Sequence, residues 1–156
     1  TLARDNLKEA WRSVLDLRAA PLEGRTLVEA VEELARRTAS EAGLEINVKV
    51  IGGGRPLSPR IEAGLYRIVQ EALANVVTHA DADRVEVGIE TTPEQIGLII
   101  EDDGRGFNTE DVVDGRYGLV GLNERARLLG GELVLESSAG VGTRLKIHVP
   151  LTPPES

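Results

Sequence analysis

Cysteine is absent from the 156-residue chain, and only two histidines are present. The absence of cysteine excludes disulfide bonds, thiol catalysis and cysteine-ligated metal ions, and it is consistent with a reducing compartment. Two histidines cannot supply a histidine-rich zinc site. Any catalysis or metal binding must therefore use oxygen ligands, backbone groups or other side chains.

Long apolar runs and excess positive charge are missing as well. No apolar stretch approaches the roughly 20 residues that a membrane-spanning helix needs, and the N-terminus shows no signal-peptide pattern. The formal net charge is −8 and no basic patch is evident, so we expect no nucleic-acid partner. An anionic ligand would have to bind through backbone N–H groups, a few arginines or a bridging cation.

The spacing of the apolar residues predicts helices and strands that alternate along the chain. The helices are expected over residues 2–18, 26–43, 58–80 and 119–129, and the strands over 44–50, 84–90, 96–101, 132–137 and 143–149. Five strands and three helices suffice for a two-layer α/β sandwich. The first helix stands apart, before a break at Pro21. Because the chain begins with Thr1 rather than methionine, we expect it to be a fragment of a longer protein.

Local signals define two of the helix starts. Thr26 and Glu29 form a capping box, and Gly43 suits the end of that helix. Ser58 as the N-cap and Pro59 as the first helical residue begin the long third helix.

The long helix carries a polar row opposite its apolar stripe. Arg67, Glu71, Asn75 and His79 are spaced by four residues, so they project from one side. A solvated polar face is the simplest explanation, but asparagine is a poor helix former unless its amide is used. An asparagine oxygen can bind Mg²⁺, and a nearby glutamate can order a metal-bound water or accept its proton.

The stretch "EDDGRGF", residues 101–107, joins three carboxylates to two glycines. It fits neither a calcium loop nor a Walker or Rossmann phosphate loop. A carboxylate can accept a hydrogen bond from the amine of adenine, whereas guanine presents a carbonyl there. Asp102 is thus a candidate base reader, and the glycines would let a flat ring approach the backbone. The alternative is a solvated aspartate at a strand end, and Asp103 is expected to have no role either way.

Two further glycine clusters flank the last helix and the last strand. "YGLVGLNERA" places Gly118 and Gly121 at a helix start, where free N–H groups bind anions. "SAGVGTRL" places Gly142 before Thr143, which offers a hydroxyl. Each cluster alone is explained as a turn, and Gly130-Gly131 as a helix end.

The four motifs "QEALANVVTHA", "DDGRGF", "GLVGLNERA" and "GVGT" occur in this order at fitting distances. In this combination the chain resembles the ATP-binding (Bergerat) domain of sensor histidine kinases over roughly residues 26–150. The closer match is the nitrate-sensor-like subfamily that pairs with helix-turn-helix response regulators. The resemblance implies an α/β sandwich in which three helices cover a five-stranded mixed sheet, with ATP and Mg²⁺ as ligands.

The resemblance also implies roles for single residues. Asn75 would bind Mg²⁺, and Glu71 would be the catalytic acidic residue near the metal. His79 would contact phosphate or ribose, and Asp102 would hold the adenine amine with support from Thr143. The remaining ATP-binding positions are Gly104, Gly106, Gly118, Gly121, Leu122 and Gly142. Residues 103–117 would form a lid over the ATP.

The resemblance divides the chain into the end of a dimerisation helix (1–20), an ATP-binding catalytic domain (26–151) and a tail (152–156). The implied partners are an upstream dimerisation and phosphoacceptor domain and a response regulator. The full-length protein would be a homodimer, and the domain would be cytoplasmic without membrane contact, even in a membrane-anchored sensor.

Two positions depart from the family pattern. Thr78 stands where the family often has a basic residue that touches phosphate, which would weaken ATP binding or shift that contact to Arg116 or Arg125. Neither His79 nor His148 is followed by an acidic residue as a phosphoacceptor would be, and His148 is expected to face solvent. Two rivals follow: a serine kinase or binding protein of the anti-sigma-factor type, and a degenerate nucleotide-binding scaffold.

Overall fold

The computed structural model describes residues 22, 24–53, 57–105, 119–138 and 140–151. The expected helix over 2–18, the segment 1–20 and the tail 152–156 therefore lie outside the described residues. The same holds for residues 106–117 of the expected lid.

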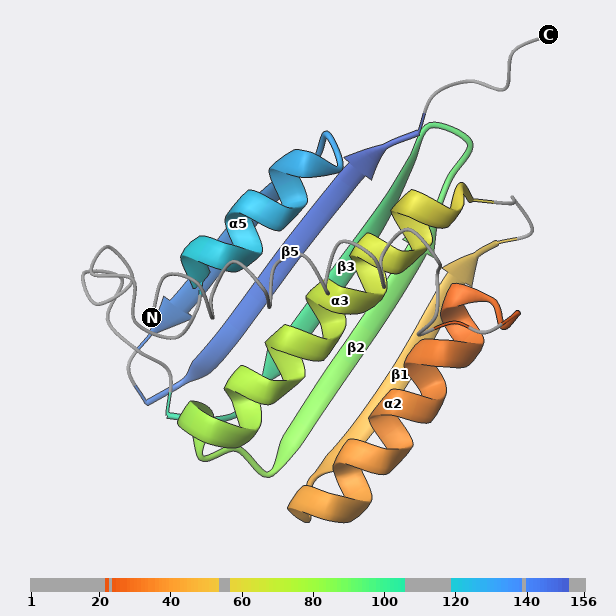
Figure 1. The fold of residues 1–156 in the computed structure, drawn as a ribbon. Helices are drawn as coiled ribbons and strands as arrows, with labels where there is room; N and C mark the ends of the chain where they lie inside the picture. The colour runs from red at the N-terminus through yellow and green to blue at the C-terminus, as the bar shows by residue number, and fades with distance from the viewer. Residues whose placement is uncertain (1–21, 23, 54–56, 106–118, 139, 152–156) are drawn as a thin grey trace, which may run out of the picture.

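Five strands form a single mixed sheet in the order β1-β2-β3-β5-β4 (Figure 1). They are β1 Glu45–Gly52, β2 Arg84–Thr91, β3 Gln95–Asp102, β4 Glu132–Ser138 and β5 Gly142–Pro150. The pair β1–β2 is parallel, and the other neighbouring pairs are antiparallel. All five predicted strands are confirmed, with ends that differ by at most two residues.

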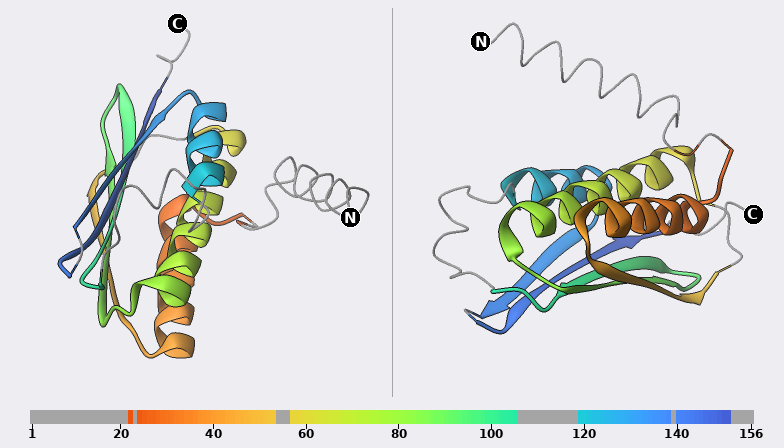
Figure 2. Two further views of the ribbon diagram at one scale, coloured as in Figure 1. Left: turned by 90° about the vertical axis from the view of Figure 1, so that its left-hand side faces the viewer. Right: turned by 90° about the horizontal axis from the view of Figure 1, so that it is seen from below.

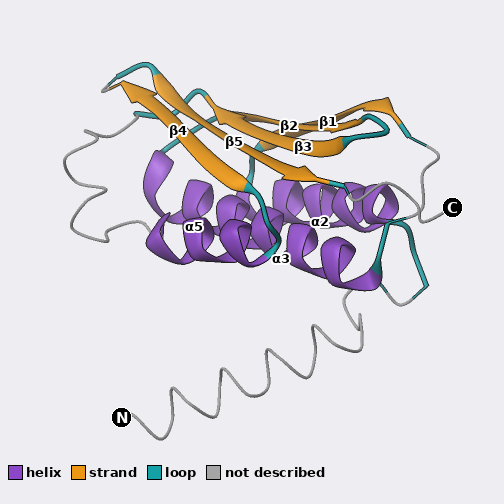
Figure 3. Ribbon diagram, turned by 90° about the horizontal axis from the view of Figure 1, so that it is seen from above, coloured by secondary structure: helices purple, strands orange, loops and turns teal. Residues whose placement is uncertain are grey.

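The described helices lie on one face of this sheet (Figures 2 and 3). They are α2 Leu27–Ala42, α3 Pro59–Asn75 with its π-helical continuation η1 Val76–Ala80, and α5 Leu119–Leu128. The two-layer sandwich with three helices is therefore confirmed. No helix in the described part of the chain is long and apolar enough to cross a membrane.

The capping signals act as predicted. The Thr26 hydroxyl accepts from the Glu29 N–H at 3.2 Å, and the Glu29 carboxylate accepts from the Thr26 N–H at 3.1 Å. Gly43 ends α2 in the left-handed conformation, with φ 70°. Ser58 accepts the N–H of Ile61 at the start of α3. Local capping thus marks where these two helices begin and where α2 ends, and the Glu62 carboxylate of α3 also accepts the N–H of Leu27 at 3.2 Å.

The core lies between the helices and one face of the sheet. Leu65, Ile68 and Leu73 of α3 and Leu98 of β3 are at most 1% exposed. The apolar run of β3 predicts a central strand, and β3 is central, but its burial alternates and Ile99 is 37% exposed. The reason is that, in the described structure, helices cover the sheet on one side alone.

Candidate functional site

Asp102 ends β3 on the face of the sheet that the helices cover. Burial alternates along β3 so that Ile96, Leu98, Ile100 and Asp102 share the core face. Asp102 is 7% exposed, and it is the one buried polar or charged residue among those described. The alternative of a solvated aspartate is therefore excluded.

One backbone N–H group binds the Asp102 carboxylate, and a second influences its pKa. The Gly104 N–H donates to Oδ1 at 2.9 Å, and the backbone of Thr143 on the neighbouring strand also lowers the pKa of this carboxyl. Burial is the main influence on this group, and it raises the pKa of Asp102. The two N–H groups act in the opposite direction, while the nearby charge of Asp103 raises the pKa further.

Gly104 joins the loop after β3 to the end of η1. The Arg105 N–H donates to the Ala80 carbonyl at 2.8 Å, and a Cβ on Gly104 would lie 2.2 Å from that carbonyl oxygen. Glycine is thus required here for a close approach within the chain itself. Sequence reasoning, which invoked space for a flat ring, missed this backbone contact.

Gly142 makes a similar close approach from the other side. It has φ 130°, which L side chains rarely adopt, and a Cβ there would lie 2.2 Å from the Asp102 carbonyl oxygen. Asp102 therefore lies where the end of η1, the loop after β3 and the start of β5 converge. Three of the four motifs are brought together around one carboxylate.

Two hydroxyls continue the row that starts at this carboxylate, Thr143 on the neighbouring strand β5 and Ser137 on the next strand β4. The Ser137 hydroxyl donates to the Gly142 carbonyl at 3.1 Å, and its oxygen lies 3.1 Å from Thr143 Oγ1. Asp102, Ser137, Gly142 and Thr143 line a hollow of about 300 Å³ at the end of the sheet, together with Val141 and with Glu101, Glu136 and Arg144, which alternate with them along the strands. Sequence reasoning missed Ser137, because its position opposite Thr143 depends on the register of the hairpin, which the structure supplies.

The polar row of α3 is half-buried rather than solvated at Arg67, Glu71 and Asn75. Glu71 pairs with Arg125 of α5 at 3.0 Å, a contact that sequence reasoning missed. Asn75 is the last α-helical residue and its side chain makes no capping hydrogen bond. The row therefore presents a carboxylate in an ion pair and an amide placed at a change of helix type.

The helix changes to π geometry over Val76–Ala80, a change that is frequent at functional sites. The four-residue spacing that aligned His79 with Asn75 assumes α geometry, and the side chain of His79 lies outside the described atoms. The Thr78 hydroxyl donates to the Ala74 carbonyl at 2.8 Å.

The second glycine cluster is described only in part, since Gly106 and Gly118 lie outside the described residues. Gly121 lies in the first turn of α5, and a Cβ there would meet nothing within 4 Å. The Leu122 side chain is fully buried in the core, so Leu122 can offer a ligand only backbone atoms. The expected helix start is confirmed, while a contact of these residues with a ligand remains a prediction.

Asp103 corrects an expectation. Its Oδ1 accepts the N–H groups of Asp83 and Arg84, both at 2.9 Å. These two bonds lower the pKa of Asp103, and the bond from Arg84 has the larger effect. The prediction that Asp103 has no role is therefore wrong. It ties the start of β2 to the end of β3.

The residues present suit Mg²⁺, which needs few protein ligands, better than a metal ion whose ligands all come from protein side chains. Within the described residues no three His, Cys, Asp or Glu side chains gather as a metal site. Mg²⁺ usually takes one or two protein oxygens and completes its shell with water and substrate phosphates. Asn75, with its uncapped amide, could supply such an oxygen.

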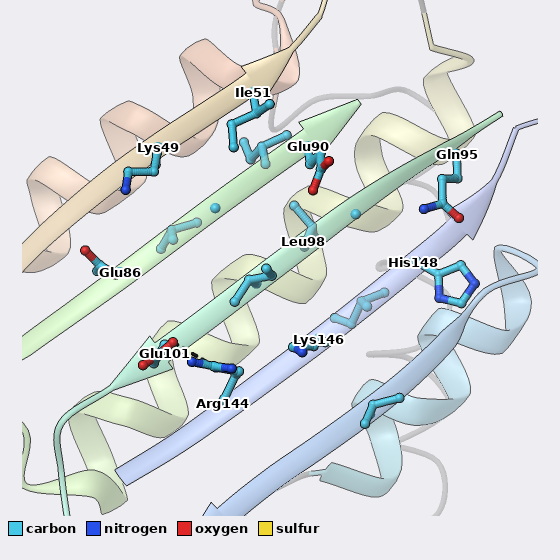
Figure 4. Close-up of a pocket in the computed structure, with 17 residues that line it drawn as sticks. Lys49, Ile51, Glu86, Glu90, Gln95, Leu98, Glu101, Arg144, Lys146 and His148 are labelled. Carbon is cyan, nitrogen blue, oxygen red and sulfur yellow. Dashed lines mark hydrogen bonds and ion pairs between the residues drawn. The ribbon is translucent and has the colours of Figure 1, made fainter. Parts of the chain in front are cut away.

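The opposite face of the sheet holds a larger hollow of about 580 Å³ (Figure 4). One ion pair lies within it, between Arg144 and Glu101 at 2.9 Å. His148 is exposed on this face, as predicted. The described helices all cover the other face, so this surface is the solvated side of the sheet.

A family model described as "Histidine kinase-, DNA gyrase B-, and HSP90-like ATPase" matches residues 60–153, more than half of the chain. The chain belongs to this ATPase family. The predicted fold and family are thus confirmed, while the nitrate-sensor-like subfamily remains a prediction.

Several relatives of this ATPase-family domain are named as sensor kinases. It is 33% identical over 154 residues to the signal transduction histidine-protein kinase/phosphatase DegS of Brevibacillus brevis, covering 99% of this chain and 40% of that protein. It is 35% identical to the sensor histidine kinase LiaS of Bacillus subtilis, over 99% and 42% of the two chains. The chain thus spans about two fifths of the length of these relatives.

A solved structure agrees with these relatives. The histidine kinase domain of the blue-light activated histidine kinase from Erythrobacter litoralis matches with a TM-score of 0.66 and 26% identity, over 81% of this chain and 62% of that one.

Proposed function

We propose that this domain binds ATP with Mg²⁺ as the catalytic domain of a two-component sensor histidine kinase. In the whole protein it would transfer the γ-phosphate to a histidine on an upstream dimerisation domain. The observation that carries the nucleotide assignment is the buried Asp102 carboxylate at the meeting point of three motifs. The names of the relatives support the kinase assignment.

Asp102 supplies an acceptor for the adenine amine. Its carboxylate is held by the N–H of Gly104, and it lines the hollow at the end of the sheet. A guanine carbonyl at the same point would face a second acceptor. Burial makes this discrimination stronger, because an unpaired polar group away from water is costly.

The phosphate end would lie at α3 and α5. Free N–H groups in the first turn of α5, which includes Gly121 and Leu122, suit an anion. Bound Mg²⁺ would neutralise the charge on the phosphates, and Asn75 would offer it an oxygen. Glu71 lies one turn before Asn75, and Arg125 holds its carboxylate. Its proposed role is to order a metal-bound water.

Phosphoryl transfer then requires mainly the positioning of ATP against the acceptor. Neither His79 nor His148 is followed by an acidic residue, so the acceptor is proposed to lie outside this chain. The further partners proposed for the whole protein are a response regulator and a second copy of itself, in the cytoplasm.

Asn75→Ala is expected to lose the Mg²⁺-dependent part of ATP binding while keeping the fold. Alanine is the better helix former, so helix content and thermal midpoint should not fall. Losing an oxygen that faces the metal should cost about tenfold or more in affinity. Calorimetric titration with ATP, with and without Mg²⁺, measures this. Asn47→Ala, at an exposed position on β1, is the control. An Mg²⁺ dependence equal to the parent's would remove Asn75 as a ligand.

The chemistry of the labelled product separates the proposal from its two rivals. When the longer natural protein is incubated with γ-labelled ATP, phosphohistidine gives label that is lost in acid and stable in base. This chain alone should remain unlabelled. Acid-stable label on serine would support the anti-sigma-type rival, and the absence of label together with weak ATP binding would support the scaffold.

A further inference from the structure

Ser137, Thr143 and Asp102 form a row across three strands. Thr143 on β5 is the register partner of both Asp102 on β3 and Ser137 on β4. Side chains of directly paired residues point to the same face of a sheet, so all three lie on the face that the helices cover. They also line the same hollow.

The contacts of this row favour one arrangement of the hydroxyl protons. A serine hydroxyl carries one proton, and the Gly142 carbonyl, 3.1 Å from the Ser137 hydroxyl, can only accept it. Distance alone lets either hydroxyl donate in the 3.1 Å contact between Ser137 and Thr143, and the bond to the carbonyl assigns Thr143 as the donor there. The proton of Thr143 is thus directed away from Asp102, and Thr143 Oγ1 keeps its lone pairs for a ligand.

We propose that Ser137 is a specificity-determining positioning residue that makes the Thr143 hydroxyl an acceptor toward the nucleotide base. The inference rests on the proposed ATP binding and concerns how that site selects its base. A threonine hydroxyl by itself can rotate to donate or to accept, so it would tolerate either an amine or a carbonyl. With Ser137 in place, Thr143 Oγ1 and the Asp102 carboxylate offer two acceptors to the two protons of the adenine amine.

Guanine would have to reverse this arrangement. To donate to a guanine carbonyl, Thr143 would have to turn its proton away from Ser137 and break the bond between the two hydroxyls. One neutral hydrogen bond contributes about 0.5–1.5 kcal/mol, which corresponds to about two- to tenfold in selectivity. Ser137 thus adds to the discrimination by Asp102 without touching the nucleotide.

The test is the ratio of the affinities for ATP and GTP, measured by calorimetry in the presence of Mg²⁺. Ser137→Ala should reduce the ratio about two- to tenfold, mostly by improving GTP binding. Ser137→Thr keeps a hydroxyl at this position and should retain the ratio of the parent. A general structural defect would weaken the binding of ATP and of GTP alike, so a change in the ratio of their affinities reports the proposed role of Ser137 alone.

Thr143→Val provides the second arm. It should lower the ratio by itself, and adding Ser137→Ala in this background should change nothing further. If Ser137→Ala does not fold, the Thr143→Val result decides, and an unchanged ratio overturns the inference.

The failures of the inference and of the proposed function are distinguishable. A parent that does not bind ATP overturns both. A parent that prefers ATP and loses this preference in Asp102→Asn, but keeps it in Ser137→Ala, overturns the role of Ser137 alone.

Discussion

Asp102→Asn is expected to bind ATP about ten- to a hundredfold more weakly than the parent and yet to be no less stable at pH 7. The asparagine oxygen can still accept the Gly104 N–H, which preserves the turn after β3. Its amide would direct a donor at the adenine amine, so two donors would face each other. This pair of results would show that the carboxylate serves binding rather than folding.

The effect on stability follows from the direction of the pKa shift. Burial raises the pKa of Asp102, so folding favours its protonated form. Its contribution to the free energy of unfolding is full below the unfolded aspartate pKa of about 3.9. That contribution is lost as the pH rises through the raised folded pKa. Asparagine does not titrate, so the free energy of unfolding of the variant should increase relative to that of the parent as the pH rises from about 4 to 7.

Urea unfolding of the parent and Asp102→Asn at several pH values measures this difference, and calorimetry measures ATP binding. A variant that binds ATP as tightly as the parent would remove Asp102 as the base reader. A variant whose stability relative to the parent falls as the pH rises would contradict the burial argument.

Asp103→Ala is the matched control for Asp102→Asn, and its effects should be opposite. Asp103 accepts the N–H groups of Asp83 and Arg84, and its pKa is lowered. Its stabilisation is therefore present above the unfolded pKa of about 3.9 and is lost as the pH falls through the lowered folded value. Asp103→Ala should lose stability at pH 7 and bind ATP nearly as the parent does.

The two aspartates show how far the sequence predicts the site. Asp102 could be named as a candidate because its motif has a recognisable pattern, whereas its burial emerges only from the structure, in which β3 alternates. The structural role of Asp103 could not be predicted, because its hydrogen-bond partners lie about 20 residues away in the sequence. Their position depends on how β2 and β3 align. Adjacent and chemically identical side chains thus take different roles from tertiary context.

The same division holds along the chain. The capping of α2 by Thr26 is encoded within four residues, and so it was predictable from the sequence. The Glu71–Arg125 pair joins two helices, and the Ser137–Thr143 bond depends on the register of a hairpin. The π turn at Val76–Ala80 left no mark in the apolar spacing. Such features require the packed structure.

Gly142→Ala should have the largest effect on stability among the changes considered. Gly142 has φ 130°, and a Cβ would lie 2.2 Å from the carbonyl oxygen of Asp102, which is backbone and cannot turn aside. Backbone strain of about 1–3 kcal/mol and overpacking of about 1–3 kcal/mol together give a loss of about 2–6 kcal/mol. Urea unfolding measures this loss.

Gly140→Ala is the control in the same turn. Gly140 also has a positive φ, 81°, but a Cβ there would meet nothing within 4 Å, so the expected cost is the conformational strain alone, about 1–2 kcal/mol. Gly142→Ala should also weaken ATP binding, because moving the Asp102 carbonyl displaces the Asp102 carboxylate. Gly140→Ala should bind ATP as the parent does. Equal losses of stability in the two variants would show that the strained φ, and not the close approach to Asp102, is what requires glycine at residue 142.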